Sequence, residues 1–438
     1  MGAHSAHRGD EGPRATRHGA TVNRDVAGVP SHATAGADYR LRLSAFYGAL
    51  FLILGIHLPF LPVWLYARGL SAEEIAFVTA APLVLRVFVT PATAIFADRT
   101  GRHRSLVNIL ALIALLLALL LSQMQGFWGL LLLAVPFAIS LSTIMPLTET
   151  IAVAGVRTYG LDYGRMRLWG SISFVGAGFL CGWLIDRTSA EAVIGCLLVG
   201  VVATVAFAWA LPERAGAASS DATRESAAVP QASRTRSGLG LSEAGRLVRT
   251  PVFLGFLVAA GAVQGAHGMF YAFGALAWQA QGISTVWIGA LWAVAIAGEV
   301  FLFAYSGRIV TRWGPATLLV AAGCASVIRW ALMALSPALP VLVPLQILHA
   351  LTYGASHLAA MHFIARAVPE SSQGTAQALY ATMAMGVVIG GATLASGRLY
   401  AQIGAEAYFA MAALAAVGLA AALFVRARWS GGLLWASK

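Results

Sequence analysis

Five charged side chains interrupt long apolar segments of this 438-residue chain: Arg86, Glu149, Arg167, Glu299 and Arg329. A charge at the centre of a membrane-spanning helix costs about 2.5–3.5 kcal/mol on insertion scales, so each group requires a partner or a task. A carboxylate in that setting can carry a proton, and a planar guanidinium can hold a ligand carboxylate through two N–H groups. These residue types therefore indicate ion recognition and proton transfer.

Glu149 and Arg167 are predicted to form a pair. Glu149 lies a few turns before the end of one apolar segment, and Arg167 lies one or two turns after the start of the next. At ~1.5 Å per residue the two side chains reach a similar depth on adjacent helices, where each offsets the desolvation of the other. The pair either faces a transport pathway or locks the first bundle as a static ion pair. Arg165 is expected to point away, toward the surface.

The second half of the chain carries its own set of polar groups. Glu299, Arg329 and His349 fall inside three successive apolar segments, so we expect them to share one depth. Two polar stripes at helical spacing consist of Gln264, His267 and Tyr271, and of Gln346, His349, Tyr353 and His357. Lipid cannot satisfy such groups, so the stripes are expected to line a cavity. The alternative is interhelical hydrogen bonding, worth about 0.6 kcal/mol per bond.

Arg86 has no partner that the sequence identifies. Asp98 lies about three turns away on the same predicted helix, which is beyond the reach of the Arg86 side chain. Arg86 is therefore expected to face the cavity or a carboxylate elsewhere, and a functional and a structural role stay equally open.

The composition places the chain in the membrane class. Hydrophobic residues make up 59% of it and charged residues 11%, whereas soluble domains carry about 25% charged residues. Twelve apolar runs approach the roughly 20 residues that cross a bilayer: 41–66, 73–97, 105–123, 127–152, 167–185, 190–211, 251–279, 284–306, 315–336, 338–365, 373–400 and 405–425. The predicted fold class is an all-α membrane protein with twelve transmembrane helices.

The net charge of +11 follows the predicted topology. Arginines crowd alternate connections, such as ADRTGRHR, while the connections between them carry one arginine or none. This positive-inside pattern predicts that both termini are cytoplasmic, in a cell (inner) membrane, and it argues against nucleic-acid binding.

No motif for covalent chemistry is found in the sequence. It contains no GxxxxGK[ST] loop for ATP, no HExxH and no GxSxG, and its histidines and cysteines do not fall at metal-ligand spacing. We therefore expect no enzymatic activity, no metal and no cofactor. Titratable groups inside the membrane favour a proton gradient as the energy source.

A polar segment rich in Ala, Ser, Arg and Gly divides the chain into two six-helix halves. The predicted units are a disordered N-terminal tail (1–39), an N-terminal bundle (40–211), a cytoplasmic linker (212–245), a C-terminal bundle (246–429) and a cytoplasmic tail (430–438). Glycines four residues apart, Gly178 with Gly182 and Gly386 with Gly390, predict close approach of helices.

Four stretches carry a resemblance to a known family. ADRTGRHR is similar to the signature loop of the major facilitator superfamily, with Ala94 where a glycine is usual, and LDYGRMRLWGS, QGAHGMFYAF and LQILHALTYGASHLAAMHFIA resemble its phenylpropionate permease family. The likeness covers about residues 40–430. It implies a monomer that imports an aromatic carboxylate with protons by alternating access. A sugar or nucleoside symporter, a drug exporter, and a membrane sensor or scaffold using the linker remain alternatives.

The resemblance extends to single residues. In the distantly related lactose permease, a Glu and an Arg matching Glu149 and Arg167 hold the substrate. Residues matching Glu299, Arg329 and His349 serve substrate binding and proton coupling there. The resemblance therefore implies substrate contacts for the pair, for Arg329 and for both stripes, with proton coupling through Glu149, Glu299 or His349.

One departure from that pattern and one loop complete the predicted site. Where the permease has a coupling carboxylate one turn after its histidine, this chain has Thr352, so the coupling residue stays open. Asp98, Arg99 and Arg102 of the signature loop are expected to form a gating ion-pair cluster at the cytoplasmic surface, away from the substrate.

Overall fold

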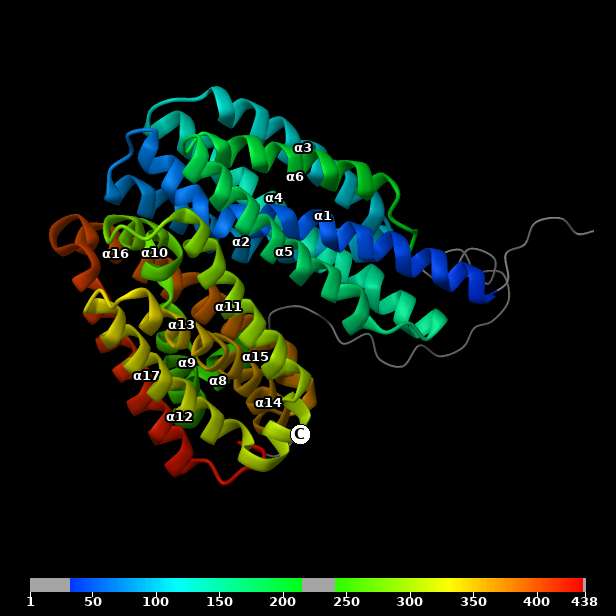
Figure 1. The fold of residues 1–438 in the computed structure, drawn as a ribbon. Helices are drawn as coiled ribbons and strands as arrows, with labels where there is room; N and C mark the ends of the chain where they lie inside the picture. The colour runs from blue at the N-terminus through cyan, green and yellow to red at the C-terminus, as the bar shows by residue number, and fades with distance from the viewer. Residues whose placement is uncertain (1–31, 215–240, 436–438) are drawn as a thin grey trace, which may run out of the picture.

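The computed structural model describes residues 32–214 and 241–435, and this part of the chain is helical, without β-strands. Figure 1 shows two groups of helices that meet at one end and diverge toward the other. The first group consists of α1 (His32–Ala67), α2 (Ala72–Thr100), α3 (His103–Gln123), α4 (Phe127–Tyr159), α5 (Tyr163–Arg187) and α6 (Ala192–Trp209).

The second group follows the same up-and-down course with more interruptions. It consists of α8 (Leu241–Arg249), α9 (Pro251–Gly265), α10 (Gly268–Ala280), α11 (Thr285–Ala304), α12 (Ser306–Ala334), α13 (Leu339–Ile347), the π-helix η1 (Ala350–Ala355), α14 (Ser356–Ala367), α15 (Glu370–Thr382), the π-helix η2 (Met383–Val388), α16 (Ile389–Ile403), the 3₁₀ turn η3 (Gly404–Ala407) and α17 (Tyr408–Arg428).

Eleven helical runs in the described residues are long and apolar enough to cross a membrane. The last of them, Glu370–Arg428, has 59 residues, and about 20 residues suffice for one crossing. The turn η3 divides this run, and Gly404 at its start has φ 56°, a conformation that favours glycine. The run therefore supplies two legs, in agreement with the twelve predicted segments.

The first helix begins earlier than predicted. Residues 32–39 belong to α1, although they were assigned to a disordered tail. Tyr39 is buried, and its hydroxyl donates to the carbonyl of Ile151 on α4 at 2.7 Å, which ties this end of the helix to the bundle.

The linker also differs from the prediction where the structure describes it, and the described part of the C-terminal tail contacts the second half. Residues 241–245 form the start of α8. Residues 430–435 return to the second half, where the Leu434 N–H donates to the Ala367 carbonyl at 2.8 Å. The remainder of the predicted tails and linker lies outside the described residues.

Short connections with clear end signals set the helix boundaries. Ser71 and Glu74 form a capping box at the start of α2, in which each side chain accepts the other residue's backbone N–H. The α4–α5 connection is equally sharp, because Gly160 ends α4 in the left-handed conformation and Asp162 caps α5 by accepting the Arg165 N–H. These caps fix where Glu149 and Arg167 fall relative to each other.

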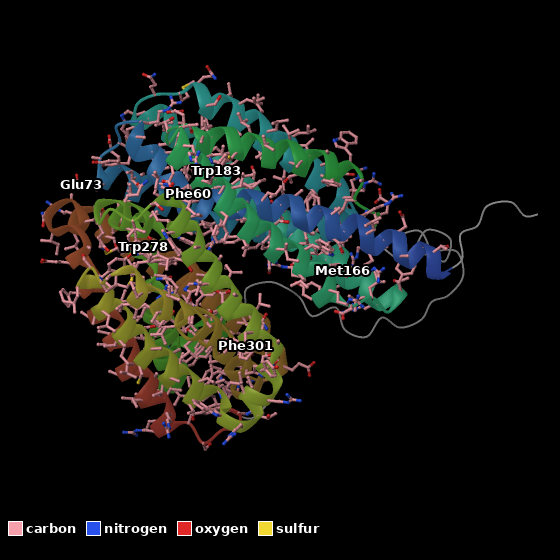
Figure 2. All side chains as sticks on the ribbon, in the orientation of Figure 1. Phe60, Glu73, Met166, Trp183, Trp278 and Phe301 are labelled. Atoms are coloured by element: carbon pink, nitrogen blue, oxygen red, sulfur yellow. The ribbon has the colours of Figure 1, made fainter. Side chains whose placement is uncertain are left out.

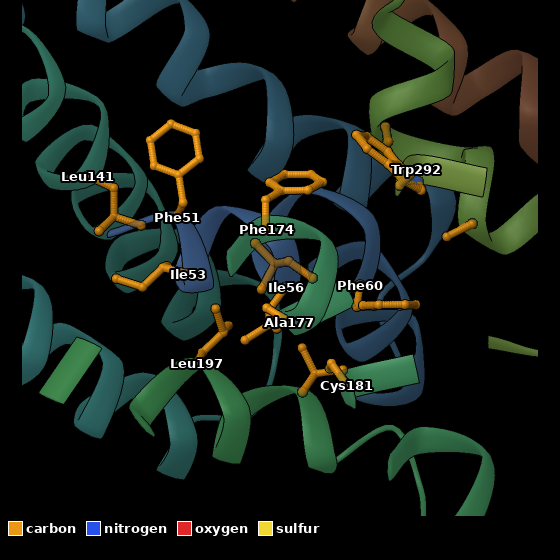
Figure 3. Close-up of a cluster of buried hydrophobic side chains, with 14 of the residues drawn as sticks. Phe51, Ile53, Ile56, Phe60, Leu141, Phe174, Ala177, Cys181, Leu197 and Trp292 are labelled. Atoms are coloured by element: carbon orange, nitrogen blue, oxygen red, sulfur yellow. The ribbon is translucent and has the colours of Figure 1, made fainter. Parts of the chain in front are cut away.

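The first half packs around an apolar core between α1, α5 and α6. Figure 3 shows Ile53, Ile56, Phe174 and Leu197 among the side chains of this region, and all four are buried. The outer surfaces are apolar too, as Figure 2 illustrates: Phe301 is 68% exposed and Trp183 46%. An apolar exterior around an apolar core is the arrangement expected in lipid.

The two halves touch through the predicted glycine pairs. We call the face where α1 begins and α17 ends the terminal face, and the opposite one the far face. Close to the far face, a Cβ on Gly182 would overlap the Thr285 carbonyl, and one on Gly289 would overlap the Gly178 carbonyl. Gly386 and Gly390 likewise press against α2, at Val87 and Val84. The prediction of close helix approach is confirmed, and the helices concerned belong to different halves.

Candidate functional site

Glu149 and Arg167 lie together, as predicted. Arg167 Nε is 3.7 Å from Glu149 Oε1, and each side chain is 30% exposed. The guanidinium carbon of Arg167 lies 3.9 Å from the centre of the Phe51 ring and 5.5 Å from that of Tyr47. Gly170 makes room for this stack, since a Cβ there would lie 2.9 Å from the Phe51 ring. The result is a partly exposed cation on an aromatic platform, with one long contact to a carboxylate.

Arg329 is held quite differently. It is completely buried in the second half, and its Nη1 lies 2.9 Å from His349 Nδ1 and 3.0 Å from Thr352 Oγ1, while Nη2 donates to Gln346 Oε1 at 2.9 Å. Its guanidinium also lies 4.4 Å from the centre of the adjacent Trp330 ring. Three side chains therefore bind this guanidinium before any ligand arrives.

The hydrogen bonds fix the proton position on His349. An arginine N–H can only donate, so His349 Nδ1 accepts and the ring proton sits on Nε2. His349 Nε2 in turn lies 2.8 Å from Glu299 Oε1 and donates to it. A neutral imidazole thus connects a buried guanidinium to a carboxylate, and Glu299, at 15% side-chain exposure, is the more accessible end of this relay.

His267 has the opposite tautomer. Its Nδ1 faces the carbonyls of Val263 and Gln264 at 3.1 and 3.2 Å and must donate to them, so Nε2 accepts from the Thr352 hydroxyl at 3.0 Å. Thr352 can then accept from Arg329 and donate to His267. At the position of the coupling carboxylate in the lactose permease, this chain has a hydroxyl that joins two helices.

The polar stripes only partly face open space, which corrects the prediction. Gln264, His267, Gln346 and His349 are buried inside the second half and bind other helices, which is the interhelical alternative. Only three members stay half-buried: Tyr271, Tyr353 and His357, the last with its Nδ1 3.1 Å from the Tyr380 hydroxyl. The physical reason is that one helix breaks at His267 and the other passes through η1, so neither keeps a single face.

The signature loop forms a different cluster from the one predicted. Asp98 Oδ1 lies 3.0 Å from Nε2 of the buried His103 and 3.9 Å from Arg214 Nη1. Arg99 and Arg102 are exposed and make no ion pair within the described residues. The carboxylate was expected to pair with these two arginines, but the start of α3 at His103 brings the imidazole to it first.

Two contacts between the halves were not anticipated from the sequence. Asp186, at the end of α5, accepts the backbone N–H groups of Thr285 at 2.9 Å and Val286 at 3.2 Å. It thereby caps α11, whose own N-cap residue, Ser284, makes no side-chain capping bond. Arg86 Nη2 donates to the Met385 carbonyl at 2.8 Å. In the sequence, Asp186 at the predicted end of a span could have indicated the first contact. The unpaired Arg86 could have indicated the second.

Comparison with known proteins agrees with this architecture. A model of the MFS_1 like family matches residues 40–411. A probable 3-phenylpropionic acid transporter of Escherichia coli (strain K12) is 34% identical, over 84% of this chain and 93% of that protein. The maltose permease of Geobacillus stearothermophilus is 29% identical, over 83% and 89% respectively. The crystal structure of the nucleoside transporter NupG matches with a TM-score of 0.73 at 16% identity, over 90% of this chain and all of that one, which shows a shared fold.

Proposed function

Because this chain belongs to the MFS_1 like family of major facilitator transporters and is not an enzyme, we propose that it carries an aromatic carboxylate together with protons. The substrate class follows the similarity to a probable 3-phenylpropionic acid transporter. The proposed cycle is alternating access by a monomer in the inner membrane, with both termini in the cytoplasm. With that orientation, the conformation described here opens inward.

The availability of Arg167 is the observation that carries this proposal. Both terminal nitrogens of Arg329 are bound by protein side chains, whereas Arg167 is partly exposed and has only a long contact to Glu149. A ligand carboxylate can take a bidentate geometry on such a guanidinium. The rings of Phe51 and Tyr47 beside it suit an aromatic body. Arg167 is thus the better of the two predicted carboxylate receptors.

The same arrangement supports proton coupling. A substrate carboxylate on Arg167 displaces Glu149, whose negative charge is then relieved by a proton. In the second half, Glu299 is the accessible end of the relay to Arg329, and His349 has no free Nδ1 lone pair to protonate while Arg329 binds it. We therefore assign proton uptake to the two glutamates, with His349 as the link that positions Glu299.

A sugar symporter is the second candidate, because the maltose permease is 29% identical over most of the chain. Carboxylates next to aromatic rings also suit sugar hydroxyls and faces. The two candidates differ in the charge of the substrate, so competition by unlabelled 3-phenylpropionate, maltose and uridine separates them.

The test is uptake of labelled 3-phenylpropionate into proteoliposomes under an inward proton gradient. Accumulation that collapses with a protonophore is the expected result. Arg167→Gln should lower uptake at least about tenfold, because a charge-assisted bond to a carboxylate is worth about 1.5–3 kcal/mol. Arg165→Gln, two residues away on the exposed side of the same turn, is the matched control and should transport normally. Uptake of maltose with none of 3-phenylpropionate would overturn the proposal.

A further inference from the structure

Arg86 is a charge without a counter-ion in the middle of the protein. It lies halfway along α2, and no carboxylate comes within ion-pair distance of it in residues 32–214 and 241–435. Its hydrogen bond there is the one that Nη2 donates to the Met385 carbonyl, 2.8 Å away in the other half. A neutral carbonyl compensates a half-buried guanidinium poorly, so this position favours an anion.

The partner of Arg86 lies in an irregular part of its helix. Met385 belongs to the π-helix η2, a geometry found often at functional sites. The Met385 sulfur also lies 3.9 Å from the Tyr380 hydroxyl, which is 3.1 Å from His357 Nδ1. The Arg86 contact therefore joins α2 to a polar group of the second half, at a place where the two halves meet.

Arg86 is deeper in the membrane than Arg167 and its partner. Thr90 and Thr143 mark one level, since their hydroxyl oxygens are 3.0 Å apart between α2 and α4. Glu149 lies six residues from Thr143 toward the terminal face, and Arg86 four residues from Thr90 toward the far face. At ~1.5 Å per residue the two differ in depth by about 15 Å. Two arginines of the first half are thus available to an anion at two successive depths.

We infer that Arg86 is a second binding site for the carboxylate of the substrate. This inference rests on the proposed transport of a carboxylate. Substrate that enters from the terminal face is received at Arg167 and moves toward the far face until its carboxylate replaces the Met385 carbonyl on Arg86. Substrate that enters from the far face during import meets the two arginines in the reverse order. That exchange gives Arg86 an ionic partner and removes a direct bond between the halves. Arrival of substrate at mid-depth thereby releases α2 from η2, and the halves can rock.

The experiment separates binding from exchange. Equilibrium binding of labelled 3-phenylpropionate and counterflow, in which external label exchanges with internal unlabelled substrate, are measured for wild type, Arg86→Gln, Arg86→Lys and Arg165→Gln. Arg86→Gln should bind within about threefold of wild type, because Arg167 is intact. Its counterflow should fall at least about tenfold. Arg86→Lys keeps the charge and should recover part of the exchange, and Arg165→Gln should match wild type.

If the Arg86–Met385 bond only holds the two halves together, the opposite result is expected, because its removal leaves exchange normal or faster. Normal counterflow by Arg86→Gln beside an active wild type therefore overturns the role of Arg86 and leaves the proposed function intact. If Arg86→Gln and Arg86→Lys are equally impaired, the charge is irrelevant and the inference is also wrong. A wild-type protein that neither binds nor exchanges 3-phenylpropionate overturns the proposed substrate, and with it the second binding site at Arg86. Retained binding in the variants shows that they are folded.

Discussion

The two halves hold the same pair of residue types in opposite ways. Arg167 and Glu149 in the first half touch at 3.7 Å and are each 30% exposed. Arg329 and Glu299 in the second half are joined through His349, with contacts of 2.9 and 2.8 Å, and Arg329 is fully buried. The two guanidinium groups therefore differ in the number of protein bonds that each already makes, and this difference is the basis for the ligand site proposed at Arg167.

This difference suggests a division of labour. A loosely held guanidinium exchanges a weak protein contact for a ligand carboxylate at little cost, because the pair is already solvated in part. A buried guanidinium with three bonds to protein side chains would lose several of them to do the same. The first half is thus suited to receiving the substrate, and the second to holding a carboxylate ready for a proton.

Of the substitutions proposed, replacing Arg329 should have the largest effect, a loss of protein stability. Arg329→Gln leaves Gln346, His349 and Thr352 without their shared donor, and loss of one partner from a buried charged network costs about 3–5 kcal/mol. Thermal unfolding in detergent should show a large fall in stability. Arg312→Gln, on the exposed start of the same helix, should unfold like wild type. Equal stability of all three proteins would show that the network contributes nothing to the fold.

Removing the charge of Glu299 should have a smaller, purely functional effect. A gradient of one pH unit supplies about 1.4 kcal/mol per proton, which sustains roughly tenfold accumulation. Glu299→Gln cannot release a proton, so accumulation should vanish while counterflow continues. Glu370→Gln, an exposed carboxylate at the start of α15, serves as the control. Full accumulation by Glu299→Gln would remove Glu299 from proton coupling and leave Glu149 as the candidate.

The sequence was informative for contacts between helices that are consecutive in the chain. Glu149 and Arg167 are separated by one short connection with a glycine and an aspartate at its ends, so their depths could be estimated by counting residues. Arg329 and His349 are likewise on consecutive spans. The stripes failed because the predicted spacing assumed 3.6 residues per turn. One helix breaks at His267, and η1 changes the period of the other.

Contacts between the halves could not be predicted in this way. Asp186 meets Thr285 across 99 residues, and Arg86 meets Met385 across 299. Neither pairing follows from periodicity, because it depends on which helices of the two halves come together and at what rotation. The glycine spacing at Gly178 and Gly182 indicated that some helix approaches closely, without indicating which one.

Removing the Asp186 cap on α11 should have the smallest effect, a modest increase in how often the far-face contact opens. Asp186→Ala removes the acceptor for the first N–H groups of α11, and such a cap is worth about 1 kcal/mol. The far-face contact should therefore open about fivefold more often. Spin labels at Ser189, in the connection after α5, and at Ala280, the last residue of α10, should report a larger population of long distances in this variant.

Asp162 offers a matched control, because it caps α5 within its own half by accepting the Arg165 N–H at 3.1 Å. Asp162→Ala should cost a similar free energy of unfolding, yet it should leave the distance between the same labels unchanged. If both variants shift the label distance equally, the cap acts on overall stability, and Asp186 does not control the far face. If only Asp186→Ala does so, one carboxylate from the first half governs how readily the second half swings away from it.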